Sequence, residues 1–103
     1  MWSKLYTNKR LALLGDGFAP IGCTGDKYSL LRYVGIEKHQ VVFEVNFTTK
    51  KVYSTAPDIE YNKAYPYSTR NRVTEMDIDD NWDADTFYVN IAEFMRKVVE
   101  PLC

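Results

Sequence analysis

The feature that most constrains the fold is a helical periodicity at the C-terminal end of the chain. Apolar residues recur there every three or four positions and fall within roughly 160° of a helical wheel: Phe87, Tyr88, Ile91, Ala92, Phe94, Met95, Val98, Val99 and Leu102. Val89 alone among the apolar residues projects from the polar side. An arc this wide predicts a helix over Ala84–Glu100 that lies across a sheet and buries most of its circumference.

Residues at both ends of this segment support the helix. Asp83 is placed to cap the first turn, and Trp82 before it is placed to pack against Phe87. Glu93 and Lys97 have the i,i+4 spacing that favours an ion pair. Pro101 is expected to end the helix.

Alternating apolar residues predict the sheet. Over Gln40–Phe47 every second side chain is apolar and bulky, which is typical of a strand with one buried face. A polar connection at residues 48–51 then leads into Val52–Thr55, so the two segments form a hairpin. Tyr28–Val34 is also compatible with a strand, which makes three pieces of an antiparallel meander.

Together these patterns predict one α+β domain covering residues 1–103. It consists of an antiparallel sheet of four to six strands, built from hairpins in a meander, with the amphipathic helix packed across one face. Residues 3–14 fit either a hairpin or a helix, and the poor helix propensity of Thr7 and Asn8 slightly favours the hairpin. Residues 56–72 form one long irregular stretch with room for a helical turn after Pro57, and such loops are either functional or packed.

Composition limits the setting. No apolar run is long enough to span a membrane, and the first ten residues lack the apolar block of a signal peptide. Two cysteines, Cys23 and Cys103, make a poor disulfide framework, so two free thiols in a reducing cytoplasm are expected.

No complete catalytic, metal-binding or nucleotide-binding motif is present. Residues 17–24 match a phosphate-binding loop at both glycines and at its threonine, but Cys23 replaces the lysine that would hold the phosphates. We therefore interpret the glycines here, Gly22 included, as turn residues. His39 stands alone in a predicted turn, and residues 77–83 have Trp82 where a calcium loop needs glycine. We expect neither an enzyme nor a metal or cofactor site.

The charge distribution is the clearest functional signal. Residues 75–85 hold six carboxylates and no basic side chain. Residues 1–74 carry eleven Lys/Arg and six Asp/Glu, a net charge of +5. Residues 75–103 carry two Lys/Arg and eight Asp/Glu, a net charge of −6. Asp83 and Asp85 suit a helix N-terminus. If residues 73–79 are a strand, its outward face is acidic, and four carboxylates lack a local structural purpose: Glu75, Asp77, Asp79 and Asp80.

A second pattern lies in residues 61–72, where aromatic residues alternate loosely with cationic and amide side chains. Such a mixture is typical of surfaces that stack bases or sugars and hold phosphates, although tyrosines that pack a loop would give the same pattern. The candidate residues are Tyr61, Tyr65, Tyr67, Arg70 and Arg72.

Two functions follow as hypotheses. The leading one is a small non-enzymatic protein-interaction module. Its acidic segment, residues 75–85, would bind a basic surface of another protein, most concretely by blocking the groove of a nucleic-acid-handling protein. The binding residues would be Glu75, Asp77, Asp79, Asp80 and Trp82. The alternative is a ligand or single-stranded nucleic-acid binder that uses the Tyr/Arg-rich residues 61–72. The sequence is also compatible with a homo-oligomer.

Overall fold

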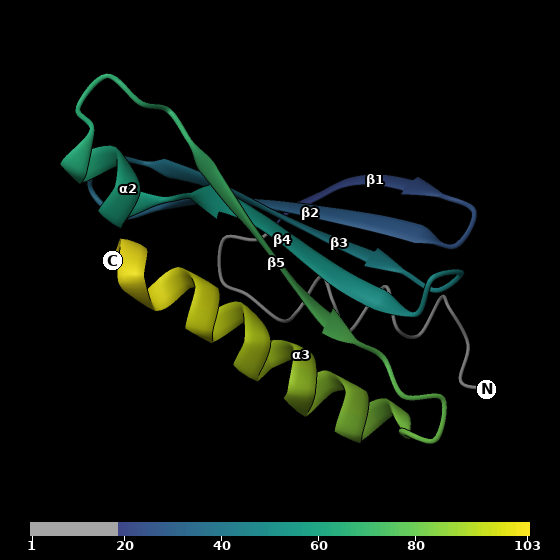
Figure 1. Ribbon diagram of the computed structural model, residues 1–103. Helices are drawn as coiled ribbons and strands as arrows, with labels where there is room; N and C mark the ends of the chain where they lie inside the picture. The colour runs from purple at the N-terminus through teal and green to yellow at the C-terminus, as the bar shows by residue number, and fades with distance from the viewer. Residues whose placement is uncertain (1–18) are drawn as a thin grey trace.

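The computed structural model describes residues 19–103, and within them five strands form one antiparallel sheet in sequence order. The strands are β1 (Ala19–Thr24), β2 (Lys27–Val34), β3 (His39–Asn46), β4 (Lys51–Pro57) and β5 (Asn71–Asp77). The helices are α2 (Ile59–Ala64), α3 (Ala84–Val99) and a short 3₁₀ turn η1 (Glu100–Leu102). Figure 1 shows α3 running along one face of the sheet, so the predicted α+β architecture is confirmed.

The core lies between α3 and the central strands. Val41, Phe43 and Val45 alternate along β3 and are fully buried, as is Val52 on β4. From the helix, the buried residues are spaced by four positions: Phe87, Ile91, Met95 and Val99. Phe94 lies beside this stripe with its ring edge-on to that of Phe43, the centroids 6.1 Å apart. Val89 is 60% exposed, as the helical phase predicts.

The ends of α3 follow from the local sequence. The Asp83 carboxylate accepts a hydrogen bond of 2.7 Å from the backbone N–H of Thr86, which confirms the predicted N-cap. Lys97 Nζ lies 3.4 Å from Glu93 Oε1, so the predicted ion pair is also present. The α-helix gives way to η1 at Glu100, immediately before Pro101, because proline cannot donate the next helical hydrogen bond.

Tight turns connect the first four strands. Gly25 and Gly35 have the positive φ angles, 59° and 78°, that glycine adopts without strain. After β3, the Asn46 side chain accepts hydrogen bonds from the backbone N–H groups of Thr48 and Thr49, which closes the predicted hairpin connection. Gly22 differs from its interpretation as a turn residue: it lies within β1, where the pairing with β2 shifts register after Pro20.

Residues 56–72 are more ordered than the predicted irregular stretch. The pairing of β4 with β5 continues to Ala56 opposite Arg72 and to Pro57 opposite Asn71, so the strands take up both ends of the segment. Between them Asp58 caps α2, which is the helical turn expected after Pro57, and residues 65–70 are the irregular part. The alternatives for residues 3–14 lie outside the described residues.

Candidate functional site

The acidic segment begins on β5, at one edge of the sheet. Glu75 and Asp77 are exposed on the face that points away from α3, whereas Thr74 and Met76 are half-buried on the helix side. Asp79 and Asp80 follow in the turn that leads to α3. The predicted alternation is therefore confirmed from Thr74 to Asp77, whereas the predicted strand 73–79 ends at Asp77, so Asp79 does not continue the acidic face.

Two lysines of β4 and its preceding turn lie against these carboxylates. Lys51 Nζ lies 2.9 Å from Glu75 Oε1 and 3.5 Å from Asp77 Oδ1, and Lys50 forms an ion pair with Asp80. The hydrogen bond to Glu75, followed by the charges of Glu75 and Asp77, raises the pKa of the Lys51 ammonium group. Glu75, Asp77 and Asp80 thus have local partners, contrary to the expectation that they lack a structural purpose.

Asp79 also has a local role. Its side chain accepts a 2.8 Å hydrogen bond from the backbone N–H of Asn81, and its carbonyl accepts one of 3.1 Å from Trp82. These bonds shape the turn between β5 and α3. Trp82 itself is half-buried against the core, so only part of its ring is available to a partner.

Even with these contacts, the segment keeps an excess of negative charge. Residues 75–85 contribute six carboxylates, and within residues 19–103 Lys50 and Lys51 form ion pairs with three of them, Glu75, Asp77 and Asp80. The acidic side chains remain at the surface, where the carboxylates and the two lysine ammonium groups are in contact with water. The two lysines reduce the local field without reversing its sign.

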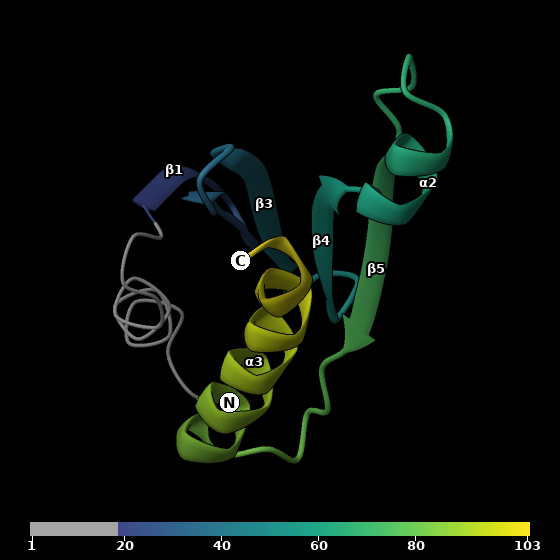
Figure 2. The ribbon, with the colours of Figure 1, turned by 90° about the vertical axis from the view of Figure 1, so that its left-hand side faces the viewer.

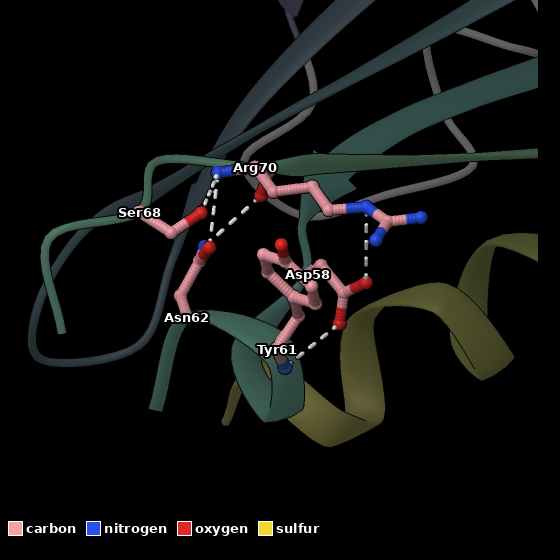
Figure 3. A network of polar contacts seen from close by, with 5 residues as sticks. All are labelled: Asp58, Tyr61, Asn62, Ser68 and Arg70. Atoms are coloured by element: carbon pink, nitrogen blue, oxygen red, sulfur yellow. Dashed lines mark hydrogen bonds and ion pairs between the residues drawn. The ribbon is translucent and has the colours of Figure 1, made fainter. Parts of the chain in front are cut away.

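The Tyr/Arg-rich residues lie at the other end of β5, around α2. Figure 3 shows how Arg70 closes this loop: its backbone N–H donates to Asn62 Oδ1 at 2.9 Å, and Asn62 Nδ2 donates back to the Arg70 carbonyl at 2.9 Å. The same N–H lies 3.3 Å from Ser68 Oγ. Asp58 accepts from the Tyr61 N–H and lies 3.9 Å from Arg70 Nε.

The side chains of this region divide into two groups. The Arg70 guanidinium lies 4.5 Å above the Tyr61 ring, which in turn lies 4.7 Å from the Tyr65 ring, so these three form one cluster. Tyr67 is fully exposed at the tip of the loop. Arg72 points away from the cluster, since it lines a hollow on the α3 side of β5. The structure therefore brings together three of the five candidate residues.

A large polar hollow adjoins the Tyr/Arg-rich region. It has a volume of about 620 Å³, and its lining includes Asn62, Lys63 and Asn71 together with His39 from β3. The His39 Nε2 atom lies 3.2 Å from a carboxylate oxygen of Glu37. Sequence reasoning did not place His39 beside residues 61–72, because that proximity depends on how β3, β4 and β5 pair.

Two further hollows lie between β5 and α3 and were missed by the sequence analysis. One, of about 340 Å³, is lined by Arg72 and Thr74 of β5 and by Val98 of α3, among others. The second, of about 400 Å³, is lined by Met76 and by the flanking acidic residues Glu75 and Asp77. Phe94 and Lys97 of α3 line both, so the two hollows are neighbours. The sequence signal for these two hollows was the width of the apolar arc on α3, because part of that arc extends beyond the strands that the helix covers.

The chain matches no protein-family profile, no curated protein and no solved structure. Within residues 19–103, no three His, Cys, Asp or Glu side chains are arranged to hold a metal ion. No helix in this part of the chain is long and apolar enough to cross a membrane. The candidate sites are therefore argued from their own geometry.

Proposed function

We propose that the protein is a non-enzymatic protein-interaction module whose acidic segment, residues 75–85, binds a basic surface of another protein. The observation that carries this proposal is the group of exposed carboxylates at the β5–α3 end of the molecule, Glu75, Asp77, Asp79 and Asp80, which outnumber the two described lysines that pair with them. Complementary charge acts mainly by steering the encounter, so it raises the association rate more than it lengthens the complex lifetime. A protein that binds nucleic acid through a basic groove is the partner class that this charge fits best.

The proposal places the protein in a reducing compartment such as the cytoplasm. The support is Cys103, an exposed free thiol in the described part of the chain. Structural disulfides are typical of oxidising compartments, whereas free exposed thiols suit reducing ones.

The test is a fourfold neutralisation: Glu75→Gln, Asp77→Asn, Asp79→Asn and Asp80→Asn. Each change keeps an oxygen acceptor, so the bonds to Lys51 and to the Asn81 N–H can persist while the charge is lost. We expect an unchanged fold and a markedly slower association with the protein that affinity capture and mass spectrometry identify. The difference should shrink in 1 M salt, where the Debye length is about 3 Å.

The matched control neutralises four carboxylates elsewhere: Glu37→Gln, Glu44→Gln, Glu60→Gln and Glu100→Gln. It changes the net charge by the same amount and also removes the charge of residues with ion-pair contacts: Glu44 lies 3.6 Å from Lys27, Glu100 lies 3.8 Å from Arg96, and Glu37 lies 3.2 Å from His39. If both variants slow association equally, net charge alone is responsible. If neither does so in low salt, the acidic segment is a solvated sheet edge and the proposal fails.

A second candidate function rests on the opposite end of β5. Tyr67 is fully exposed and Tyr65 is largely so, beside the polar hollow that contains Lys63 and Asn71. Aromatic rings beside cations and amides suit a small ligand or single-stranded nucleic acid, because bases stack on such rings irrespective of sequence. Arg70 is committed to Tyr61 and Asp58, and Arg72 lines the hollow on the α3 side of β5, so Lys63 is the more available cation.

This candidate is tested with mixed-sequence single-stranded DNA and RNA in low salt. Binding should weaken as salt rises, and Lys63→Ala should flatten the salt dependence by about 0.7 in log–log slope because one phosphate contact is lost, whereas Tyr67→Ala should weaken binding without changing that slope. An absence of binding in low salt excludes nucleic acid as the ligand. The 620 Å³ hollow then remains a candidate for small polar ligands.

A further inference from the structure

Both edge strands of the sheet, β1 and β5, lack a neighbour on their outer side within the described part of the chain, and β5 is the one that carries the acidic residues. β5 pairs with β4 on one side, and residues 19–103 contribute no strand to its other side. Its side chains are correspondingly open: Val73 is 64% exposed, and Arg72, Glu75 and Asp77 are exposed as well. A strand with free backbone N–H and C=O groups on one side is a template for an additional strand.

The hollows between β5 and α3 follow the same edge. Arg72 and Thr74 line the first hollow and Met76 lines the second, so the two succeed one another along the helix side of β5. Side chains two residues apart on a strand are separated by about 6.8 Å. Helix-side residues of an added strand would therefore lie next to Arg72, Thr74 and Met76, the β5 residues that line the two hollows. Figure 2 shows α3 set beneath the central strands, with β5 beyond it.

The lining of these hollows defines which side chains fit. Met76, Phe94 and Val98 are half-buried apolar residues that line one hollow or both. An apolar side chain long enough to reach them would remove this surface from water. Leucine-sized residues at alternate positions satisfy that requirement.

The face of β5 that points away from α3 favours an added strand with basic side chains. Glu75 and Asp77 point away from α3, and Asp80 follows in the turn. An added strand with Lys or Arg on this face would gain opposite-charge cross-strand pairs, and an acidic strand would be repelled. Pairing of β5 with a second copy of itself is disfavoured in the register that sets Glu75 against Glu75, because like charges then lie directly opposite.

We propose that β5 is a docking edge for an extended basic segment of another protein, which adds a sixth strand to the sheet. Its alternate apolar side chains fill the hollows beside α3, and its Lys or Arg side chains lie against Glu75 and Asp77. This inference rests on the proposed function, since it specifies the partner of the acidic segment as a strand with alternating apolar and basic residues. Backbone hydrogen bonds supply affinity in this mode of recognition, and alternate side chains supply specificity.

The test uses synthetic peptides of about nine residues, near the upper end of ordinary strand length. The probe alternates leucine with lysine, and a second peptide has the same composition with the leucines and lysines in separate blocks. Two further versions of the probe carry backbone N-methyl groups, one on its lysines and one on its leucines. Because hydrogen bonding alternates along a strand, one methylated version blocks the edge facing β5 and the other blocks the free edge.

We expect the alternating peptide to bind about tenfold more tightly than the peptide with its leucines and lysines in separate blocks. One methylated version should lose binding and the other should retain it. Amide hydrogens of residues 71–77 should exchange more slowly in the complex. Met76→Lys should weaken binding about tenfold, because a cationic side chain then replaces an apolar contact for the leucines and repels the basic probe. The control is Val89→Lys, which places the same charge on the exposed side of α3 and should leave affinity unchanged.

The outcomes separate the two proposals. If all four peptides bind equally and the fourfold neutralisation abolishes binding, charge alone attracts the partner: the docking edge is refuted and the proposed function stands. If no peptide binds, the docking edge is refuted, and the association rate of the captured partner decides the proposed function separately. If the alternating peptide binds and neutralisation has no effect on it, both proposals fail. If the free protein sediments as a dimer with residues 71–77 already protected from exchange, the edge is occupied by a second copy, which also refutes the inference. The peptide comparison does not depend on Met76→Lys folding.

Discussion

Replacing Ile91 by alanine is the most direct test of how α3 packs on the sheet. Ile91 is fully buried, and the substitution removes three carbon atoms, worth about 2.4 kcal/mol at about 0.8 kcal/mol each. The unfilled space adds to this loss, while the higher helix propensity of alanine returns about 0.5 kcal/mol. We expect a net loss of roughly 2–4 kcal/mol in the free energy of unfolding.

Val89→Ala is the matched control on the same helix. The side chain is 60% exposed, so the two lost carbons forfeit about 0.6 kcal/mol of burial, and the gain in helix propensity nearly cancels it. The net change should stay within about 0.5 kcal/mol.

Urea titrations followed by far-ultraviolet circular dichroism measure both variants. With a slope of roughly 1.5 kcal/mol per molar urea for a chain of this size, the Ile91→Ala midpoint should fall by about 1–3 M and the Val89→Ala midpoint should barely move. Equal falls at the two positions would refute the helical phase. A changed slope would indicate that the variant no longer unfolds in two states, and the comparison would then require a second probe.

The helix and the central strands were predictable because their signals are local. A 3.6-residue period over sixteen positions identifies the buried side of α3, and Asp83 marks where it begins. The alternation over Gln40–Phe47 likewise identified β3 within one residue at each end. Each prediction depends on neighbours a few residues apart, which secondary structure itself places together.

The outcome for residues 56–72 shows where local reasoning fails. The helical turn for which the sequence left room after Pro57 is present as α2, but no buried residue stabilises it, and the order of the residues that follow it was not predicted. The cap from Asp58 and the paired hydrogen bonds between Asn62 and Arg70 supply the constraint instead. The second of these joins residues eight positions apart, a distance over which composition gives no guidance.

The candidate acidic site illustrates the same limit in three dimensions. Its exposure followed from the alternation around Met76, but its lysine partners did not. Lys51 reaches Glu75 and Asp77 because β4 pairs with β5 in a register that sets Lys51 opposite Asp77. The sequence suggested β5 without specifying its neighbour, so the carboxylates looked unpartnered. The hollows beside α3 depend on the same pairing.

Two further perturbations test the turns and the helix cap. Gly25→Ala should lower the melting temperature by about 4–8 °C, because alanine is strained at a positive φ. Gly35→Ala should lower it at least twice as far, because its new Cβ also meets the backbone carbonyl of Leu102. Equal melting temperatures for the two variants would contradict this packing. For the cap, the backbone N–H of Thr86 lowers the pKa of Asp83 below its ordinary 3.8. A carboxyl group with a depressed folded-state pKa contributes stability that is present above about pH 3.8 and is lost as pH falls through the folded-state value. Asp83→Asn keeps a capping oxygen but does not titrate, so the stability advantage of the wild-type protein over this variant should vanish across that window. Urea midpoints measured from pH 7 to pH 2 check this, and a difference that stays constant over the whole range would show that the carboxylate charge of Asp83 plays no part in holding the first turn of α3.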